Sequence, residues 1–182
     1  YKSTKSGDNW STPELLSEAV NVAGATSRQP HVTSDGKYLL FSSNRAGGKG
    51  GNDIWYIGLD GSGNATGTAT NLSAVNTAGD DEAPFYHAPS KSLVFASNGL
   101  VGLGGYDLYV TKGNIGGSFE APKNMGYPVN SVKDDIYYLS TDPKSVWNNA
   151  YLSSDRNSEC CLDIYSFNRA AVMKTISGMV VD

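Results

Sequence analysis

The chain has 182 residues with a formal net charge of −4, and 39% of its residues are hydrophobic. This composition supports one folded domain and argues against an intrinsically disordered chain. Lys and Arg form no cluster, and no apolar run reaches the length of about 18 residues that a membrane span needs, so we expect neither a nucleic-acid partner nor a membrane span. The 21 glycines and 11 tyrosines favour short strands joined by tight turns over a helical bundle.

Short apolar strands bounded by turns follow one another along the chain. Residues 1–21 look like the end of a unit that begins upstream, and the only helix-like pattern is "PELLSEAV" at 13–20. The next segment contains an "SDG" turn and predicts four strands, over residues 29–33, 37–43, 53–59 and 66–72. The two middle strands carry the apolar and aromatic residues, so we expect them to be buried on both faces.

The same pattern then returns twice. "LLFSSNR" at 39–45 is followed by "LVFASNG" at 93–99 and by "AYLSSDR" at 150–156. An aspartate opens the next strand each time, with 54 residues from Asp53 to Asp107 and 56 residues from Asp107 to Asp163. The repeats therefore start near residues 28, 82 and 135.

A period of this length with four strands per unit is typical of a β-propeller blade, which is stabilised by stacking on its neighbours. The sequence predicts an all-β fold: a propeller segment of about three four-stranded antiparallel blades over residues 1–168, with 1–21 as the end of a preceding blade. Because propellers close with roughly four to eight blades, we expect this segment to belong to a larger propeller, for which we predict six blades.

The first unit, "QPHVTSDGKYLLFSSNRAGGKGGNDIWY", resembles the TolB-type, WD-like propeller repeat. That repeat combines a proline, a Ser-Asp-Gly-Lys turn, a hydrophobic strand, Ser-Asn-Arg, a glycine loop and Asp-Ile-Tyr. The second unit departs from the pattern at Gly99, where arginine is expected. The residues of the first unit that match are Pro30, Asp35, Gly36, Lys37, Phe41, Ser43, Asn44, Arg45, Gly51, Asp53 and Ile54.

Two further stretches resemble bacterial envelope proteins. "GDNWSTP" from Gly7 resembles the outer strands of propellers joined to a peptidoglycan-binding, outer-membrane-protein-A-like domain. "KTISGMVVD" at 174–182 resembles the first strand of a carboxypeptidase-regulatory-like β-sandwich, so residues 169–182 are interpreted as a linker and the start of that domain. The resemblance implies an extracytoplasmic location, in the periplasm or at the outer membrane.

The resemblance also implies a non-catalytic binding or scaffolding module, with no cofactor, that engages an envelope protein, peptidoglycan or a glycan at the mouth of the propeller channel. One alternative is a propeller glycosidase or lyase acting on a polysaccharide, which needs two nearby carboxylates; Asp81 with Asp135 is the best candidate pair. Another is a rigid structural spacer. A glycan would be gripped by exposed aromatic faces, although the same side chains could simply pack between blades; the candidates are Trp10, Trp55 and Trp147.

Charged residues cluster where the innermost strand of each unit begins, which in a propeller lies at one channel mouth. These candidate ligand-binding residues could hold Ca²⁺ or a cationic group, or could be solvated loop charges, and their spacing matches no calcium-loop motif. They are Arg28, Asp81, Glu82, Asp134 and Asp135.

A second set of charged residues recurs with the repeat. We interpret the strand-opening Asp53, Asp107 and Asp163 as structural residues that cap backbone N–H groups of their own loops or pair with the repeat's arginine. Arg45 and Arg156 are expected to tie the loop of one blade to the next. Contact with a ligand is the alternative for each.

Histidine and cysteine are rare in this chain. His31 and His87 fall near matching places in adjacent units and could share the channel wall as metal ligands, although no third ligand is evident. Cys160 and Cys161 stand where the other units have Gly50–Gly51 and Gly104–Gly105. They could close a strained ring in an oxidising compartment or remain free thiols.

Overall fold

The computed structural model describes residues 1–170, and its strands form a series of antiparallel sheets. Within those residues the only helical element is a 3₁₀ turn at Ala88–Ser90. This confirms the predicted all-β class. A short hairpin comes first, made of β1 (Lys5–Ser6) and β2 (Asn9–Trp10).

Three larger sheets follow, each an antiparallel meander in chain order. Sheet I contains β3 (Ser27–Val32), β4 (Tyr38–Ser43), β5 (Asp53–Leu59) and β6 (Ala65–Asn71). Sheet II contains β7 (Asp81–His87), β8 (Ser92–Ser97), β9 (Asp107–Lys112) and β10 (Lys123–Asn124). Sheet III contains β11 (Asp135–Ser140), β12 (Ala150–Ser154) and β13 (Asp163–Phe167).

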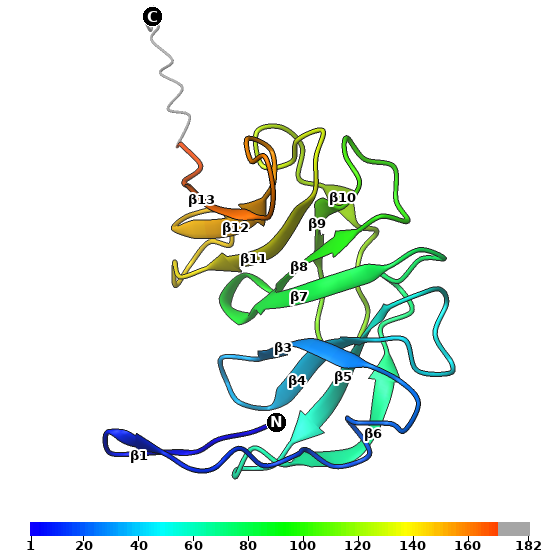
Figure 1. The fold of residues 1–182 in the computed structure, drawn as a ribbon, viewed down its shortest axis with the longest axis vertical. Coiled ribbons are helices and arrows are strands. Elements are labelled where there is room, and N and C mark those ends of the chain that lie inside the picture. The colour runs from blue at the N-terminus through cyan, green and yellow to red at the C-terminus, as the bar shows by residue number, and fades with distance from the viewer. Residues whose placement is uncertain (171–182) are drawn as a thin grey trace, which may run out of the picture.

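The three sheets stack face to face, with the first strands β3, β7 and β11 side by side along one flank (Figure 1). Leu40 and Ile54 of sheet I pack with Leu93 and Phe95 of sheet II in one apolar cluster. A second cluster of the same kind joins sheets II and III. Sheets I and II therefore hide apolar faces against their neighbours, which is why the middle strands β4, β5, β8 and β9 are mostly buried.

A buried asparagine fixes the end of sheet I, and another fixes the end of sheet II, at matching positions. Asn76 accepts from the N–H of Ile54 (2.8 Å) and donates to its carbonyl (2.9 Å). Asn130 does the same to Leu108 (2.8 and 2.9 Å). Because both amides are buried, these bonds satisfy groups that water cannot reach.

The first segment differs from the helix-like pattern of its sequence. Residues 13–20 form no helix; Glu14 makes an isolated bridge to Lys2, and Leu16 and Val20 pack on the outer face of sheet I. The packing of that face outweighs the weak helical tendency of so short a segment.

Sheet III shows three strands within residues 1–170, so its predicted fourth strand is not among them. The predicted start of a further β-sandwich falls on residues 171–182 and lies outside the described residues. No sheet within 1–170 closes on itself. None of the described residues forms a helix that is long and apolar enough to cross a membrane.

Candidate binding surface

The first strands of the three sheets share an irregularity at one place. Each strand has a β-bulge against its neighbour, between Arg28 and His31, between Glu82 and Phe85, and between Ile136 and Leu139. The residues in these bulges with positive φ are Gln29 (54°), Ala83 (50°) and Tyr137 (57°), each 54 positions after the last. A bulge re-aims the side chains beside it, so one local backbone feature is presented three times along the flank.

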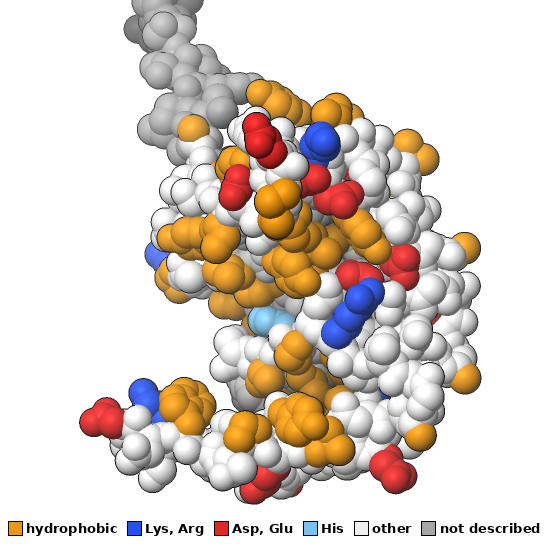
Figure 2. All heavy atoms as spheres, viewed as in Figure 1, with side chains coloured by type: hydrophobic (Ala, Val, Ile, Leu, Met, Phe, Trp, Pro, Cys, Tyr) orange, Lys and Arg blue, Asp and Glu red, His pale blue; other side chains and the backbone are white. Residues whose placement is uncertain are grey.

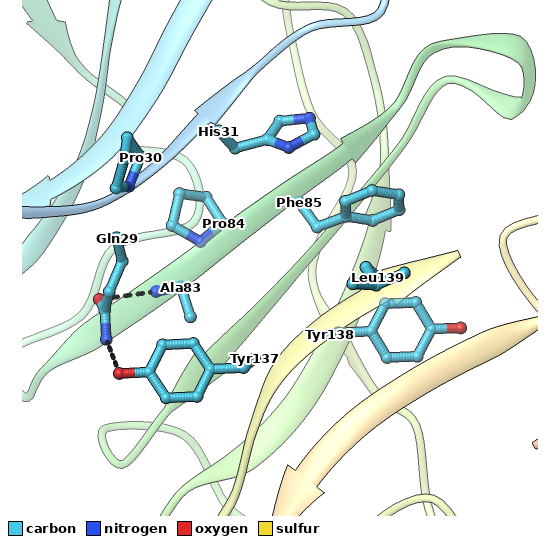
Figure 3. A pocket seen from close by; sticks show the side chains of 9 residues that line it. All are labelled: Gln29, Pro30, His31, Ala83, Pro84, Phe85, Tyr137, Tyr138 and Leu139. Atoms are coloured by element: carbon cyan, nitrogen blue, oxygen red, sulfur yellow. Dashed lines mark hydrogen bonds between the residues drawn. The ribbon is translucent and has the colours of Figure 1, made fainter. Parts of the chain in front are cut away.

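Gln29 links the three strands at their bulges (Figure 3). Its Nε2 donates to Glu82 Oε2 (3.0 Å) and to the Tyr137 hydroxyl (3.3 Å), and its Oε1 accepts from the Ala83 N–H (3.0 Å). Arg28 forms an ion pair with the same Glu82 carboxylate. This network brings together side chains that lie 53 and 108 positions apart in sequence.

A shallow pocket of about 230 Å³ opens beside this network. Figure 2 shows that the surface is hollowed on this flank, between the β1–β2 hairpin and sheet III. The pocket combines apolar rings with a few polar groups, as ligand sites commonly do. Its lining residues are Gln29, Pro30, His31, Ala83, Pro84, Phe85, Tyr137, Tyr138 and Leu139 (Figure 3).

Each histidine joins its own sheet to the next segment. His31 Nε2 lies 3.2 Å from the Tyr86 carbonyl oxygen, and His87 Nε2 lies 2.8 Å from that of Asp142, which are separations of 55 positions in both cases. The other ring nitrogen of His87 contacts Ser90 Oγ at 2.7 Å. Burial lowers the pKa of His31, and its bond to the Tyr86 carbonyl opposes that effect. Both rings therefore act as cross-links between repeats.

The candidate ligand-binding residues lie in three different settings. Arg28, with 49% of its side chain exposed, and Glu82 lie together beside the pocket. Asp134 accepts from the Tyr106 N–H (2.9 Å) and so links sheet III to the loop that precedes β9. Asp81 and Asp135 are fully buried at the first positions of β7 and β11. A substrate would therefore reach Arg28, whereas Glu82 is buried behind it and the two carboxylates nominated for hydrolysis have no exposed surface.

The buried carboxylates hold the loops that lead into their strands. The Ser131 N–H donates to Asp135 Oδ2 (2.6 Å), and Thr77 donates to Asp81 Oδ2 from its N–H and from its hydroxyl (3.0 Å). Asp135 also receives a guanidinium N–H from Arg156. Burial raises the pKa of Asp81, although its hydrogen bonds oppose that effect.

The strand-opening aspartates occupy two kinds of environment. Asp53 accepts from the Lys49 N–H and from Asn71 Nδ2 (3.1 Å). Asp107 accepts from the Leu103 N–H and from Asn124 Nδ2 (3.3 Å) in the matching way. Both therefore cap their own loops, whereas Asp163 is exposed at the start of β13.

The two arginines of the repeat clamp backbone carbonyls. Arg45 donates to the carbonyls of Ala19 (2.9 Å) and Val20. Arg156 donates to the carbonyls of Pro128 (2.8 Å) and Val129 (2.6 Å). Each guanidinium therefore ties the end of its sheet's second strand to the segment that precedes the first strand.

The three tryptophans lie in different surroundings. Trp55 is buried in sheet I beneath the Arg45 guanidinium, and Trp10 is exposed on the β1–β2 hairpin. Trp147 lies under Arg169, 5.3 Å from its guanidinium, and lines a larger pocket of about 590 Å³ between sheets II and III. Only Trp10 and Trp147 could therefore offer a ring to a ligand.

Sequence reasoning missed Gln29 and Tyr137. Their positions recur at the period of the repeat, but the residues there are Gln, Ala and Tyr, so no shared residue type marks them. The available signal was the prolines inside two of the bulges, Pro30 and Pro84, which directly follow the residues with positive φ.

Comparison with protein-family models gave no match, and comparison with curated proteins gave no significant match. Within residues 1–170, no group of three or more His, Cys, Asp or Glu side chains is placed to hold a metal ion. The site is therefore interpreted from its own geometry.

Proposed function

We propose that the chain is a propeller segment of TolB-like type from a bacterial cell-envelope protein, and that it is a non-catalytic binding module. The observation that carries this proposal is the hollow flank where three matching bulges from three sheets converge on one network. In a propeller, the first strands of successive blades line the central channel, where ligands bind. The stacking of successive meander sheets supports that arrangement.

The chemistry of the flank supports an uncharged, hydroxyl- or amide-rich ligand, such as a glycan strand, peptidoglycan or a peptide loop of an envelope protein. Tyr137 exposes 48% of its surface, and Leu139 on the same strand exposes 42%. An aromatic face with amide and hydroxyl groups beside it suits sugar rings and peptide groups. The nearest charges, Arg28 and Glu82, neutralise each other.

Binding can be tested with a matched pair of tyrosine variants. Tyr137→Gly removes the ring at the pocket and suits the positive φ there, whereas Tyr151→Ala removes a tyrosine of similar exposure (42%) on β12. We expect wild type and Tyr151→Ala to co-sediment with purified peptidoglycan or to give signals on a glycan array, and Tyr137→Gly to lose at least about tenfold in affinity, which is about 1.4 kcal/mol.

An envelope protein as the ligand requires a further arm. A photo-cross-linking amino acid at position 137, in cells that produce the protein, would capture that partner, whereas the same group at position 151 would not. If neither polymer binds and position 137 yields no more cross-linked product than position 151, the proposed surface is wrong.

A further inference from the structure

The loops before β5 and β9 end in glycine pairs that lie against the next sheet. A Cβ atom added at Gly50 would lie 2.4 Å from the carbonyl oxygen of Gly79, and one at Gly104 would lie 2.0 Å from that of Lys133. Both oxygens belong to the backbone of the loop that leads into the following sheet. Because backbone cannot swing away as a long side chain can, these junctions require glycine.

Sheet III has Cys160 and Cys161 at the matching places, since Cys161 lies two positions before Asp163 as Gly51 lies two before Asp53. Both cysteines are exposed, and no disulfide joins them in the structure. At these positions the third unit carries two side chains where the earlier units have none. Among the described residues, both thiols face solvent.

The two sulfur atoms are also brought together. Cys161 Sγ lies 2.9 Å from Cys160 Sγ, and Cys161 adopts a positive φ of 68°, which a non-glycine residue seldom takes. Ser158 turns the loop back, because its N–H donates to the Asp155 carbonyl (3.1 Å) and its hydroxyl donates to the Cys160 carbonyl. The turn thus places both thiols on one side of the loop.

We propose that Cys160 and Cys161 form a redox-active vicinal dithiol that reacts with low-molecular-weight disulfides. One thiolate attacks a sulfur of the small disulfide, a mixed disulfide forms and one small thiolate leaves. The neighbouring thiolate then attacks the protein sulfur of that mixed disulfide, the ring closes and the second small thiolate leaves. The protein dithiol is oxidised, the small disulfide is reduced to two thiols, and the protons of Cys160 and Cys161 pass to the leaving groups through solvent.

The ring would be easily reduced again. Adjacent Cα atoms lie about 3.8 Å apart, below the usual range for disulfides, and a strained disulfide has a more oxidising potential. The hydrogen bond to Cys160 and the charge of Asp163 raise the pKa of the Cys161 thiol. We therefore expect the reaction to accelerate as the pH rises above neutrality.

The experiment uses the whole chain, in which these are the two cysteines. The reduced protein is incubated with oxidised glutathione and examined by intact mass spectrometry. We expect loss of one hydrogen atom from each sulfur, complete protection from alkylation and no retained glutathione, all reversed by dithiothreitol. Cys160→Ser and Cys161→Ser should each retain one glutathione, because no neighbouring thiol remains to displace it.

Retained glutathione on the folded wild type, or dimers linked through these cysteines, would overturn the proposal. A parallel sample unfolded in urea tests the contribution of the fold. We expect the ratio of closed ring to glutathione adduct to fall at least about fivefold in urea, since the turn that aligns the sulfurs is lost. An equal ratio of closed ring to adduct in the folded and unfolded samples would mean that the fold does not bring the two thiols together.

Discussion

The guanidinium of Arg156 donates to the buried carboxylate of Asp135, and nothing equivalent reaches Asp81 at the same position of sheet II. Sheet II has Gly99 where the other sheets have arginine. One oxygen of Asp81 is consequently buried without a hydrogen-bond partner. The repeat therefore contains an aspartate at the same position twice, once paired with an arginine and once without one. The stability effects of the two aspartates can be compared within one protein.

Replacing each carboxylate by an amide should affect stability differently at the two positions. At pH 7 Asp135→Asn should lower the free energy of unfolding by about 2 kcal/mol or more, because the Arg156 charge loses its buried partner. Asp81→Asn should leave it unchanged or raise it by about 1 kcal/mol, because a buried charge without a counter-ion is removed while an acceptor for Thr77 remains. Urea unfolding of both variants measures the difference, and an equal loss in both would contradict it.

The contribution of Asp81 to the free energy of unfolding should also depend on pH. Its pKa in the folded state is raised above the ordinary value of 3.8, so the stability linked to its protonated form is complete below pH 3.8 and is lost as the pH rises through the folded pKa. The advantage of Asp81→Asn over wild type should therefore grow as the pH rises from 3.8. Unfolding curves at a series of pH values test this, and an advantage that shrinks with rising pH would refute it.

Much of the fold could be predicted from the spacing of a few markers. The same strand followed by an aspartate recurs in each unit, because each sheet must present similar apolar faces to similar neighbours. These aspartates are Asp53, Asp107 and Asp163. The site was harder to predict. Asp81 and Asp135 were assigned to an accessible channel mouth from their place at strand starts, but the loops that they hold bury them. The bulges could not be predicted either, because they are features of the backbone and no shared residue type marks them in the sequence.

Arg45 should contribute far more to stability than the exposed Lys37 in the turn between β3 and β4. Its guanidinium is mostly buried, clamps two carbonyls and lies 4.7 Å from the Phe41 ring. Arg45→Lys should cost about 2 kcal/mol in the free energy of unfolding, because an ammonium cannot reproduce the planar fork. Lys37→Met is the control, since its pair with Asp35 is exposed and worth at most about 1 kcal/mol. Similar losses in both variants would show that the clamp contributes little.

His31 should make the protein sensitive to mild acid. Burial lowers its folded-state pKa below the ordinary 6.5, so the unfolded chain takes up a proton first and stability falls as the pH drops below about that value. His31→Gln has no charge to acquire, so its stability should change less between pH 7 and pH 5. Thermal unfolding at both pH values checks this, and an identical loss in wild type and variant would assign the acid sensitivity to other groups.

The close contact between Gly50 and the loop before sheet II predicts a large loss of stability when even a methyl group is added at position 50. Gly50→Ala would place a methyl group against the carbonyl oxygen of Gly79, and backbone must move to admit it. We expect the free energy of unfolding to fall by about 2 kcal/mol. Gly61→Ala is a matched control, because no atom lies within 4 Å of its added Cβ and its backbone needs no positive φ. That control should remain within about 0.5 kcal/mol of wild type. If Gly50→Ala proves equally neutral in urea unfolding, sheets I and II do not meet as closely at this junction as the structure shows.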